Sequence, residues 1–349
     1  MTRRAEGVDV ANEVTVLIAG IGGASLGTEL LKCLRLAGGY RIVACDISPV
    51  AYGLFEDGLA GTYVIDRDDY IAAVMRLCMR EGISWIIPGG EQPMVLLSAA
   101  EAEFAAAGVR LVANNRDVIA TFSDKARSFE KLDAHGIPTP LTMELVTDAD
   151  AAKVAIPCIV KPATGSGGSV AVFFAVDHDE VRIYSDYIRR TGGRPIAQDY
   201  VGIEEGEFTI GVLSLPDGAI FGSIALRRSL ESKLSVSASG RGGIISSGYS
   251  QGYIGAFPDL CRQAEAIARA IGSTGPINVQ GRVKDGVLIP FEINPRLSAS
   301  SYLRAMAGFN EVDLYLRAVA GGEMPEKPVI REGWYLRSLT ERFVAAPAA

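Results

Sequence analysis

Carboxylate, amide and guanidinium groups stand close together in residues 291–296, Phe-Glu-Ile-Asn-Pro-Arg. Apolar and polar residues alternate here, so in a β-strand Glu292 and Asn294 would point to one face, and Pro295 would end the strand. Oxygen ligands of this kind suit Mg²⁺, which takes its other ligands from water and substrate phosphates. Arg296 adds a rigid fork of donors for a phosphate or carboxylate. The pattern predicts a magnesium and phosphate site, against the alternative of an ordinary edge strand.

A second group with phosphate-binding chemistry lies upstream, in Cys158-Ile-Val-Lys-Pro-Ala-Thr-Gly-Ser-Gly-Gly-Ser-Val170. A strand would end at Lys161, and a loop with successive backbone N–H groups would follow before strand 170–176. Glycine lets such a backbone approach phosphate oxygens closely. A P-loop is excluded because Gly-Lys-Ser/Thr and a following helix are absent, whereas a plain glycine-rich hairpin remains the alternative. The loop residues are Thr164, Gly165, Ser166, Gly167, Gly168 and Ser169.

Two further residues, Lys125 and Gln280, carry groups that suit phosphate or metal binding. Lys125 would lie in the first turn of a helix over 123–135, where the helix dipole disfavours a cation, which hints at an anion nearby. A solvated lysine is the alternative. Gln280 would lie on strand 276–283, paired through a turn at 285–286 with the strand that carries Glu292. Gln280 and Glu292 would then face the same metal.

Residues 196–201 predict a strand whose exposed backbone can pair with the edge of an adenine. Glu207, at the start of strand 207–213, could hold the ribose hydroxyls, with a solvated acid in a turn as the alternative. The residues expected to contact adenine are Gln198, Asp199, Tyr200 and Val201.

The Ser/Gly-rich segment 229–252, which contains Lys233 and Arg241, predicts a long mobile loop. Long loops in compact domains are often active-site covers. A disordered insertion is the alternative. Arg241 could pair with the carboxylate of an acyl donor.

Residues 14–112 alternate between strand and helix patterns, beginning with the continuous apolar run 14–19 of a buried parallel strand. This alternation predicts a doubly wound α/β domain with its ligand face at the carboxyl ends of the strands. The expected strands are 14–19, 41–45, 63–65, 84–87 and 109–112, and the expected helices are 26–37, 69–81 and 93–106.

The glycine turn after the first strand, from Gly20 to Gly27, allows three interpretations. A nicotinamide dehydrogenase is one, because Asp46 stands where a ribose-binding acid would, although the glycine spacing departs from the dinucleotide fingerprint. A simple turn is the second. The third, which we prefer, is that the helix N-terminus holds an anionic substrate group. The substrate-binding candidates are Gly22, Gly23, Ser25, Glu91, Arg241 and Ser298.

Length and composition restrict the class of protein. The 349 residues allow two or three domains, and 48% hydrophobic with 21% charged residues is typical of globular proteins. A net charge of −7 and the lack of a basic run argue against nucleic acid, and the longest apolar run, 14–21, is too short for a membrane span. Five scattered cysteines and an unsuitable N-terminus for export predict a cytoplasmic protein with reduced thiols. Two histidines disfavour a His-rich zinc site or a Ser-His-Asp hydrolase.

The order and spacing of these motifs resemble the ATP-grasp superfamily, and most of all short homologues of the carbamoyl-phosphate synthetase large subunit. The motifs are Asp124-Lys125, Val160-Lys-Pro162 with 164–169, Gln198-Asp-Tyr-Val201 with Glu207-Phe208, Asn278-Val-Gln280, and Glu292-Ile-Asn-Pro-Arg296. The implied fold combines α/β and α+β parts: a doubly wound pre-ATP-grasp domain (1–114), a small lobe with the glycine-rich lid (115–197) and a C-terminal lobe with the Mg/ATP site (198–349).

The resemblance also implies cofactors and roles. ATP and Mg²⁺ are the expected cofactors, with Mn²⁺ as a substitute for Mg²⁺. The implied roles are Lys125 and Lys161 on the ATP phosphates, 164–169 as lid, 198–201 on adenine, Glu207 on ribose, Gln280, Glu292 and Asn294 on the metal, and Arg296 near the reacting phosphate. The families concerned are often dimers.

The hypothesis from sequence is an ATP-dependent carboxylate–amine ligase that makes an amide or peptide bond through an acyl phosphate and releases ADP and phosphate. Lys161, Arg296 and Arg241 would assist catalysis on small-molecule substrates. The alternatives are a bicarbonate-activating enzyme like carbamoyl-phosphate synthetase, an NAD-dependent oxidoreductase, and a non-catalytic nucleotide-binding protein. One departure is Ala299, which stands where the synthetase has a second arginine.

Overall fold

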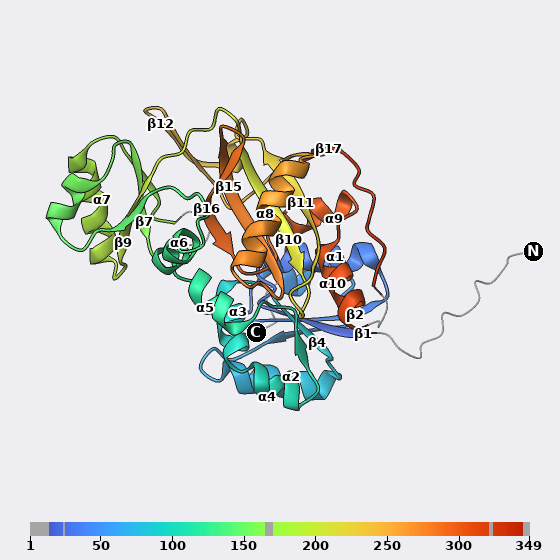
Figure 1. Ribbon diagram of the computed structural model, residues 1–349. Coiled ribbons are helices and arrows are strands. Elements are labelled where there is room, and N and C mark those ends of the chain that lie inside the picture. Colours follow the sequence, from blue (N-terminus) through green and yellow to red (C-terminus); the bar gives the residue numbers. More distant parts are fainter. Residues whose placement is uncertain (1–13, 24, 165–169, 321–323, 345–349) are drawn as a thin grey trace, which may run out of the picture.

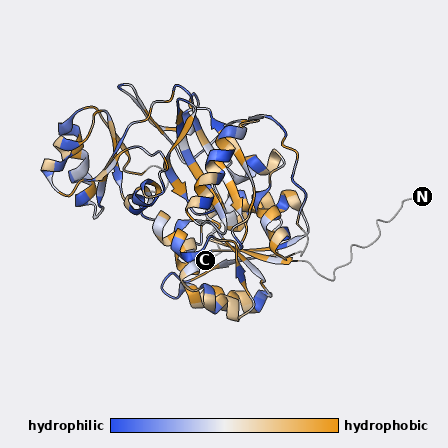
Figure 2. Cartoon of the chain, viewed as in Figure 1, coloured by the Kyte–Doolittle hydropathy of each residue, from blue (hydrophilic) through white to orange (hydrophobic). Residues whose placement is uncertain are grey.

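The computed structural model describes residues 14–23, 25–164, 170–320 and 324–344 (Figure 1). These ranges form sheets of five, four and six strands, a two-stranded hairpin, and helices packed on the sheet faces. Hydrophobic residues concentrate along the strands and the inward faces of the helices, as Figure 2 shows. None of the described helices is both long and apolar enough to cross a bilayer.

The first sheet is parallel, with strand order β3-β2-β1-β4-β5. Its strands are β1 (Val14–Ala19), β2 (Tyr40–Asp46), β3 (Gly61–Val64), β4 (Trp85–Pro88) and β5 (Arg110–Leu111). Alternate residues of β1 enter different cores: Val16 packs with the helix α1 (Leu26–Ala37), and Leu17 with α2 (Tyr70–Glu81). The doubly wound α/β prediction is therefore confirmed. The helix predicted over 93–106 is two, α3 (Glu91–Ala99) and α4 (Glu101–Ala106), because Ala100 leaves helical geometry.

The second sheet is antiparallel, with order β6-β9-β7-β8. Its strands are β6 (Thr142–Glu144), β7 (Cys158–Pro162), β8 (Phe173–Ala175) and β9 (Pro195–Asp199). One prediction needs correction here. The helix expected over 123–135 is the shorter α6 (Lys125–Asp133), capped by Asp124, and a separate helix, α5 (Arg116–Phe122), precedes it. A further helix, α7 (His178–Arg190), begins after its cap Asp177.

The third sheet has the order β16-β15-β10-β11-β14-β17. Its strands are β10 (Glu207–Ser214), β11 (Ile220–Arg228), β14 (Gly252–Ile254), β15 (Pro276–Lys284), β16 (Val287–Asn294) and β17 (Gly333–Tyr335). One face packs against α8 (Pro258–Ala270) through residues such as Phe208 and Ile210. The other face carries polar residues at its β16 end and packs near β11 against α9 (Ser301–Met306) and α10 (Glu311–Ala320).

The segment 229–252 is not one long loop. It contains the hairpin of β12 (Val236–Gly240) and β13 (Gly243–Ser246). Arg241 and Gly242, at the hairpin turn, both have positive φ, the backbone that a tight hairpin requires. The short 3₁₀ helices of the fold are η1 (Tyr52–Phe55), η2 (Asp148–Lys153) and η4 (Lys233–Ser235).

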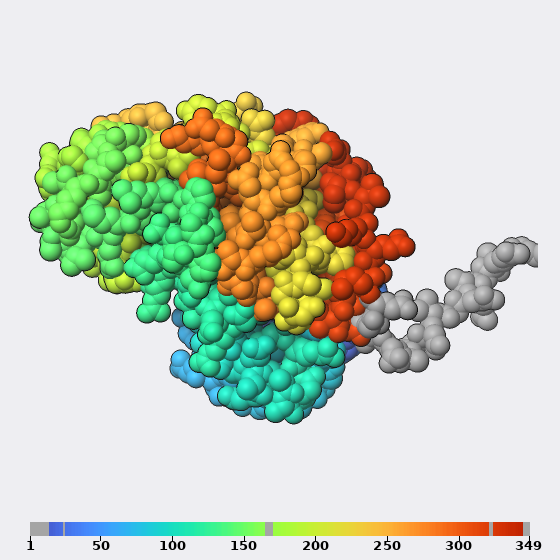
Figure 3. Space-filling view, viewed as in Figure 1, coloured from blue at the N-terminus to red at the C-terminus, as the bar shows by residue number. Residues whose placement is uncertain are grey.

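The first domain and the C-terminal lobe share a hydrophobic core. Leu30 and Leu34 of α1 belong to one buried cluster with Leu303 of α9 and Leu314 of α10. Figure 3 shows the first domain beneath the third sheet, with the small lobe projecting to one side. The domain boundaries at 114 and 197 stay a prediction, and β9 runs across the second of them.

A buried amide also joins the two parts. Asn114 is 2% exposed, donates to the Ser273 hydroxyl at 2.8 Å and accepts from the Thr274 amide at 3.0 Å. We expect Asn114→Ala to lower the free energy of unfolding by about 2 kcal/mol, because it leaves buried partners unsatisfied. Denaturant titration measures this loss, and the exposed Arg116→Ala is the control. Equal stability of the two variants would contradict the assignment.

Candidate functional site

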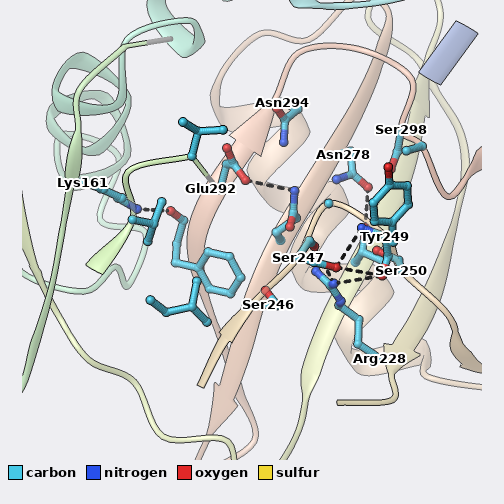
Figure 4. A pocket seen from close by; sticks show the side chains of 18 of the residues that line it. Lys161, Arg228, Ser246, Ser247, Tyr249, Ser250, Asn278, Glu292, Asn294 and Ser298 are labelled. Atoms are coloured by element: carbon cyan, nitrogen blue, oxygen red, sulfur yellow. Dashed lines mark hydrogen bonds between the residues drawn. The ribbon is translucent and has the colours of Figure 1, made fainter. Parts of the chain in front are cut away.

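A cavity of about 590 Å³ lies where the three sheets meet. Most of the predicted site residues line it: Gly23, Ser25, Glu91, Lys125, Lys161, Gln198, Asp199, Tyr200, Val201, Gln280, Glu292, Asn294, Arg296 and Ser298. Figure 4 shows Lys161 at one end, Glu292 and Asn294 near the middle, and Ser298, Tyr249 and Ser250 at the other end. Residues far apart in the chain therefore share one site.

The register of β15 and β16 sets the middle of the cavity. Gln280 lies directly opposite Glu292, and Asn278 directly opposite Asn294, so the four side chains share one face of the sheet. The Gln280 amide donates to the Glu292 carboxylate at 3.0 Å. This set of hard oxygen groups fits Mg²⁺. It contains a single carboxylate, and among the described residues no cluster of three or more His, Cys, Asp or Glu side chains could hold a metal ion.

Arg296 is held beside the predicted metal ligands. It donates to the Asn294 side-chain oxygen at 3.1 Å and to the Leu297 carbonyl at 3.0 Å, and its buried Nε has no hydrogen-bond partner. Burial lowers the pKa of Arg296, while the carboxylates of Glu292 and Glu91 raise it. Among the described residues, the buried Nε of this guanidinium has no partner, although Arg296 itself lines the cavity.

Lys161 connects the small lobe to the third sheet. Its ammonium donates to the Gln198 side-chain oxygen at 2.8 Å and to the Phe291 carbonyl at 3.1 Å, and it is 5% exposed. Neither partner is an acid. Burial, and then the charge of Lys125, lower the pKa of Lys161 to about 7, against a smaller opposing effect of Glu292. An ammonium with two neutral partners in a cavity wall is suited to an anionic ligand.

Asp199, Tyr200 and Val201 form the wall that was predicted to contact adenine. Arg282 braces it: its guanidinium donates to the Val201 carbonyl at 2.6 Å and stacks 4.8 Å from the centre of the Tyr200 ring. Sequence reasoning missed Arg282. Its position two residues after Gln280, hence on the same strand face, was the available signal.

Glu207 does not fit the predicted ribose contact. It is 1% exposed and is absent from the cavity lining. Its carboxylate pairs with Arg282 at 2.9 Å and with the buried Arg228 at 3.3 Å. Arg228 in turn donates to the Ser247 carbonyl at 2.7 Å. Glu207 thus pairs with two arginines that line the cavity and donate to backbone carbonyls of its wall at 201 and 247.

Three other predicted residues lie away from the cavity. Arg241 is at the hairpin turn and pairs with Glu180 of α7, which corrects its assignment to the substrate. Gly22 donates its N–H to Asp46, and Thr164 is exposed outside the lining. Gly165, Ser166, Gly167, Gly168 and Ser169 lie outside the described residues, so their predicted role stays a prediction.

Asp46, the residue that suggested a dehydrogenase, holds the glycine turn through its carboxylate. The Asp46 carboxylate accepts from the Gly22 amide at 2.8 Å and from the Ser48 amide at 2.9 Å, and it does not line the cavity. A ribose acid would need these oxygens for the ligand, so the geometry opposes the NAD interpretation. The N-terminal ends of α1 and α3 instead meet the cavity through Ser25 and Gly90.

Hydroxyl groups dominate the far end of the cavity (Figure 4). They come from the last residue of β13, from the segment that follows it and from the loop after β16. The residues are Ser246, Ser247, Tyr249, Ser250 and Ser298. Sequence reasoning located the 229–252 segment near the site but did not single out the four that it contributes, because serine-rich composition gives no periodic signal.

Sequence comparison relates the chain to ATP-grasp proteins. Residues 205–342 match a family model described as ATP-grasp in the biosynthetic pathway with Ter operon. The carbamoyl phosphate synthase large chain of Vibrio vulnificus is 26% identical over 319 residues, covering 86% of this chain and 28% of that protein. The corresponding protein of Gemmatimonas aurantiaca is 30% identical over 225 residues, 61% of this chain and 19% of that protein. The chain thus spans less than a third of these relatives.

Solved structures agree with this relationship. The biotin carboxylase domain of Hydrogenobacter thermophilus 2-oxoglutarate carboxylase matches with a TM-score of 0.65 and 20% identity over 91% of this chain and 72% of that one. An L-amino acid ligase from Bacillus licheniformis gives a TM-score of 0.65 with 17% identity, over 91% of this chain and 75% of that one. At these identities the likeness concerns the fold. The chain therefore has the ATP-grasp fold, and its sequence is similar to those of ATP-grasp proteins.

Proposed function

We propose that this protein is an ATP- and Mg²⁺-dependent ligase that joins a small carboxylic acid to an amine through an acyl phosphate, releasing ADP and phosphate. One observation carries the proposal. Lys125 and Lys161 of the small lobe line the same cavity as Gln280, Glu292 and Asn294 of the third sheet. Two cationic side chains and three oxygen-bearing side chains therefore line a single space, which supports binding of a magnesium-bound phosphate there.

The nucleotide would lie along the end of the cavity formed by the small lobe. Backbone groups from Asp199 to Val201 would face the adenine, and Lys125 and Lys161 the phosphates. Gln280, Glu292 and Asn294 would hold Mg²⁺, or Mn²⁺ in its place. When bound, the metal would neutralise charge on the transferring phosphoryl group.

The chemistry requires activation of a carboxylate, whose oxygen is a poor leaving group. Attack of the carboxylate on the γ-phosphorus gives an acyl phosphate and ADP, and attack of the amine then expels phosphate. The charges of Lys161 and Arg296 would stabilise the negative charge of the phosphoryl group electrostatically. No protein nucleophile is needed, and hydrolysis is limited by enclosure of the intermediate.

The remaining end of the cavity would hold the two substrates. Ser25 and Gly90, at the starts of α1 and α3, can offer backbone N–H groups to a carboxylate. Glu91 lies close enough to Arg296 to affect its pKa, and its carboxylate suits the ammonium form of an amine. Ser298 would add a hydroxyl beside them.

Bicarbonate is the second candidate for the acid, because the sequence relatives are carbamoyl phosphate synthases. A phosphate-release screen distinguishes an organic acid from bicarbonate as the substrate. Phosphate release from Mg-ATP is measured with pooled amino acids, organic acids and amines, and product masses are read afterwards. We expect release of phosphate and ADP only when an organic acid is present. Release with bicarbonate alone would favour the second candidate, and product masses that show AMP would contradict the acyl-phosphate mechanism.

Metal binding should depend on the nucleotide, because one carboxylate and two amides bind Mg²⁺ weakly without phosphate ligands. We expect Mg²⁺ alone to leave the melting temperature unchanged. Mg-ATP at a hundredfold excess over Kd should add about 2.7 kcal/mol to the free energy of unfolding. Glu292→Ala should abolish this gain, whereas the exposed Glu103→Ala should retain it. A full gain in Glu292→Ala would disprove the metal assignment.

Nucleotide binding should also take up a proton. The pKa of Lys161 is about 7 without ligand, so a large share of the amine is uncharged at neutral pH. Phosphates favour the charged form and raise this pKa, so affinity for Mg-ATP should fall as pH rises from 7 to 9. Titration calorimetry in buffers of different ionisation enthalpy measures the uptake. Lys161→Met should remove it and the exposed Lys153→Met should not; uptake that survives in Lys161→Met would refute the assignment.

A further inference from the structure

The side-chain amide of Asn278, in the cavity wall, is held in one orientation by its hydrogen bonds to Thr209 and Arg304. Asn278 lines the cavity from β15 and is 1% exposed. Its side-chain oxygen accepts from the Thr209 hydroxyl at 2.7 Å and from the Arg304 guanidinium. A guanidinium can only donate, so the atom that faces Arg304 must be the amide oxygen.

The amide nitrogen of Asn278 is left for the cavity. Within the part of the chain that the structure describes, Asn278 makes no hydrogen bond through this nitrogen. Figure 4 shows Asn278 between Asn294 on one side and Tyr249 and Ser298 on the other. The free N–H₂ group therefore lies between the predicted metal site and the hydroxyl-lined end.

The anchor behind Asn278 is a buried ion pair. Arg304 of α9 is 0% exposed and Glu311 of α10 is 1% exposed. They pair at 3.2 Å, and Glu311 also accepts from the Ser301 hydroxyl at 3.2 Å. Burying such a pair is costly, and well-packed apolar residues often give equal or greater stability. Its presence is better explained by the orientation that it imposes on Asn278 and Thr209.

The sheet makes room for this pair. Gly211 of β10 lies opposite Asn278 in the register. A Cβ atom at position 211 would collide with the Glu311 carboxylate and the Arg304 guanidinium. The polar anchor thus occupies a space that a side chain would otherwise fill.

We propose that Asn278 donates a hydrogen bond to the acyl oxygen of the substrate, and that Arg304 and Glu311 are its positioning residues. This inference rests on the proposed ligase function. Asn278 stands directly across from Asn294, and such pairs have Cβ atoms about 5 Å apart, so its amide would reach a substrate group held beside Asn294. The ligand class is a carboxylate or the acyl phosphate made from it.

The donor acts on a defined oxygen. In the first step a carboxylate oxygen bonds to the γ-phosphorus, and the bond from that phosphorus to the leaving ADP oxygen breaks. In the second step the amine nitrogen bonds to the acyl carbon, and an electron pair moves onto the acyl oxygen. The pair then returns, phosphate leaves, and the amine proton passes to solvent. A fixed N–H donor stabilises the charged acyl oxygen without reorganising.

The reverse half-reaction tests this with simple probes. Acetyl phosphate or carbamoyl phosphate is supplied with MgADP, and ATP is measured. The bond from phosphorus to the oxygen that bridges it to the acyl carbon breaks, a bond from phosphorus to an ADP oxygen forms, and the carboxylate leaves with the electron pair. Asn278→Ala, and the isosteric Asn278→Asp, should slow ATP formation about 10²-fold, the usual effect of losing one such donor. Affinity for MgADP should stay unchanged in Asn278→Ala.

The matched control is Gln263→Glu. Gln263 bonds to the same β15–β16 hairpin, accepting from the Leu288 amide at 2.8 Å, but it does so from α8, outside the cavity lining. It should form ATP at the wild-type rate. A loss of the same size in Gln263→Glu would show that any disturbance of the hairpin suffices, and would overturn the inference.

The positioning role is tested by a mutant cycle. Arg304→Met combined with Glu311→Met removes both charges together, because leaving one alone costs several kcal/mol. This double variant should raise KM for acetyl phosphate and lower kcat, with MgADP affinity kept. Adding Asn278→Ala to it should cause little further loss, since both changes disable the same donor. Fully additive losses would overturn the positioning role.

Two failures are distinguishable. If wild type forms ATP and both Asn278 variants match it, the inference is wrong and the proposed function stands. If wild type binds MgADP but forms no ATP from either acyl phosphate, acyl-phosphate chemistry is contradicted, and the inference falls with it.

Discussion

The pairing of β15 with β16 is the constraint on which the site depends. A shift of one residue would turn Gln280, Glu292 and Asn294 to the apolar face under α8 and bring Val279 and Ile293 into the cavity. Hydrophobic burial against α8 therefore fixes the positions of polar ligands on the opposite face. The hydrophobic core under α8 therefore determines which polar side chains line the cavity, although that core lies on the other face of the sheet.

Buried ion pairs hold side chains and backbone segments in place around this sheet. Glu207 carries the pairs to Arg228 and Arg282, which hold the walls at 247 and 201, and Glu311 holds Arg304 behind Asn278. Lys161 differs from these arginines, because its partners are a neutral amide and a carbonyl. Arg228, Arg282 and Arg304 are thus paired with acids, whereas Lys161, predicted to face the phosphates, has no acidic partner among the described residues.

Sequence reasoning succeeded where periodicity and motif order carry information. The apolar run at 14–19, the alternation around 292 and the order of the motifs led to the parallel sheet, the shared cavity and the ATP-grasp fold. It failed at Arg241 and Glu207, whose partners, Glu180 and the two arginines, come from elements that only the tertiary fold brings near. The β12–β13 hairpin was missed because serine and glycine, common in loops, build it.

The shared core of α1 with α9 and α10 has a consequence for how such proteins diversify. The sheets suggest modules that recombination could exchange one at a time, but the apolar residues of α1 pack both against β1 and β2 of the first domain and against α9 and α10. A chimera that imports a foreign first domain must import matching final helices as well. Beginning and end of the chain are therefore expected to change together over evolution, while the projecting lobe between them is free to vary by itself.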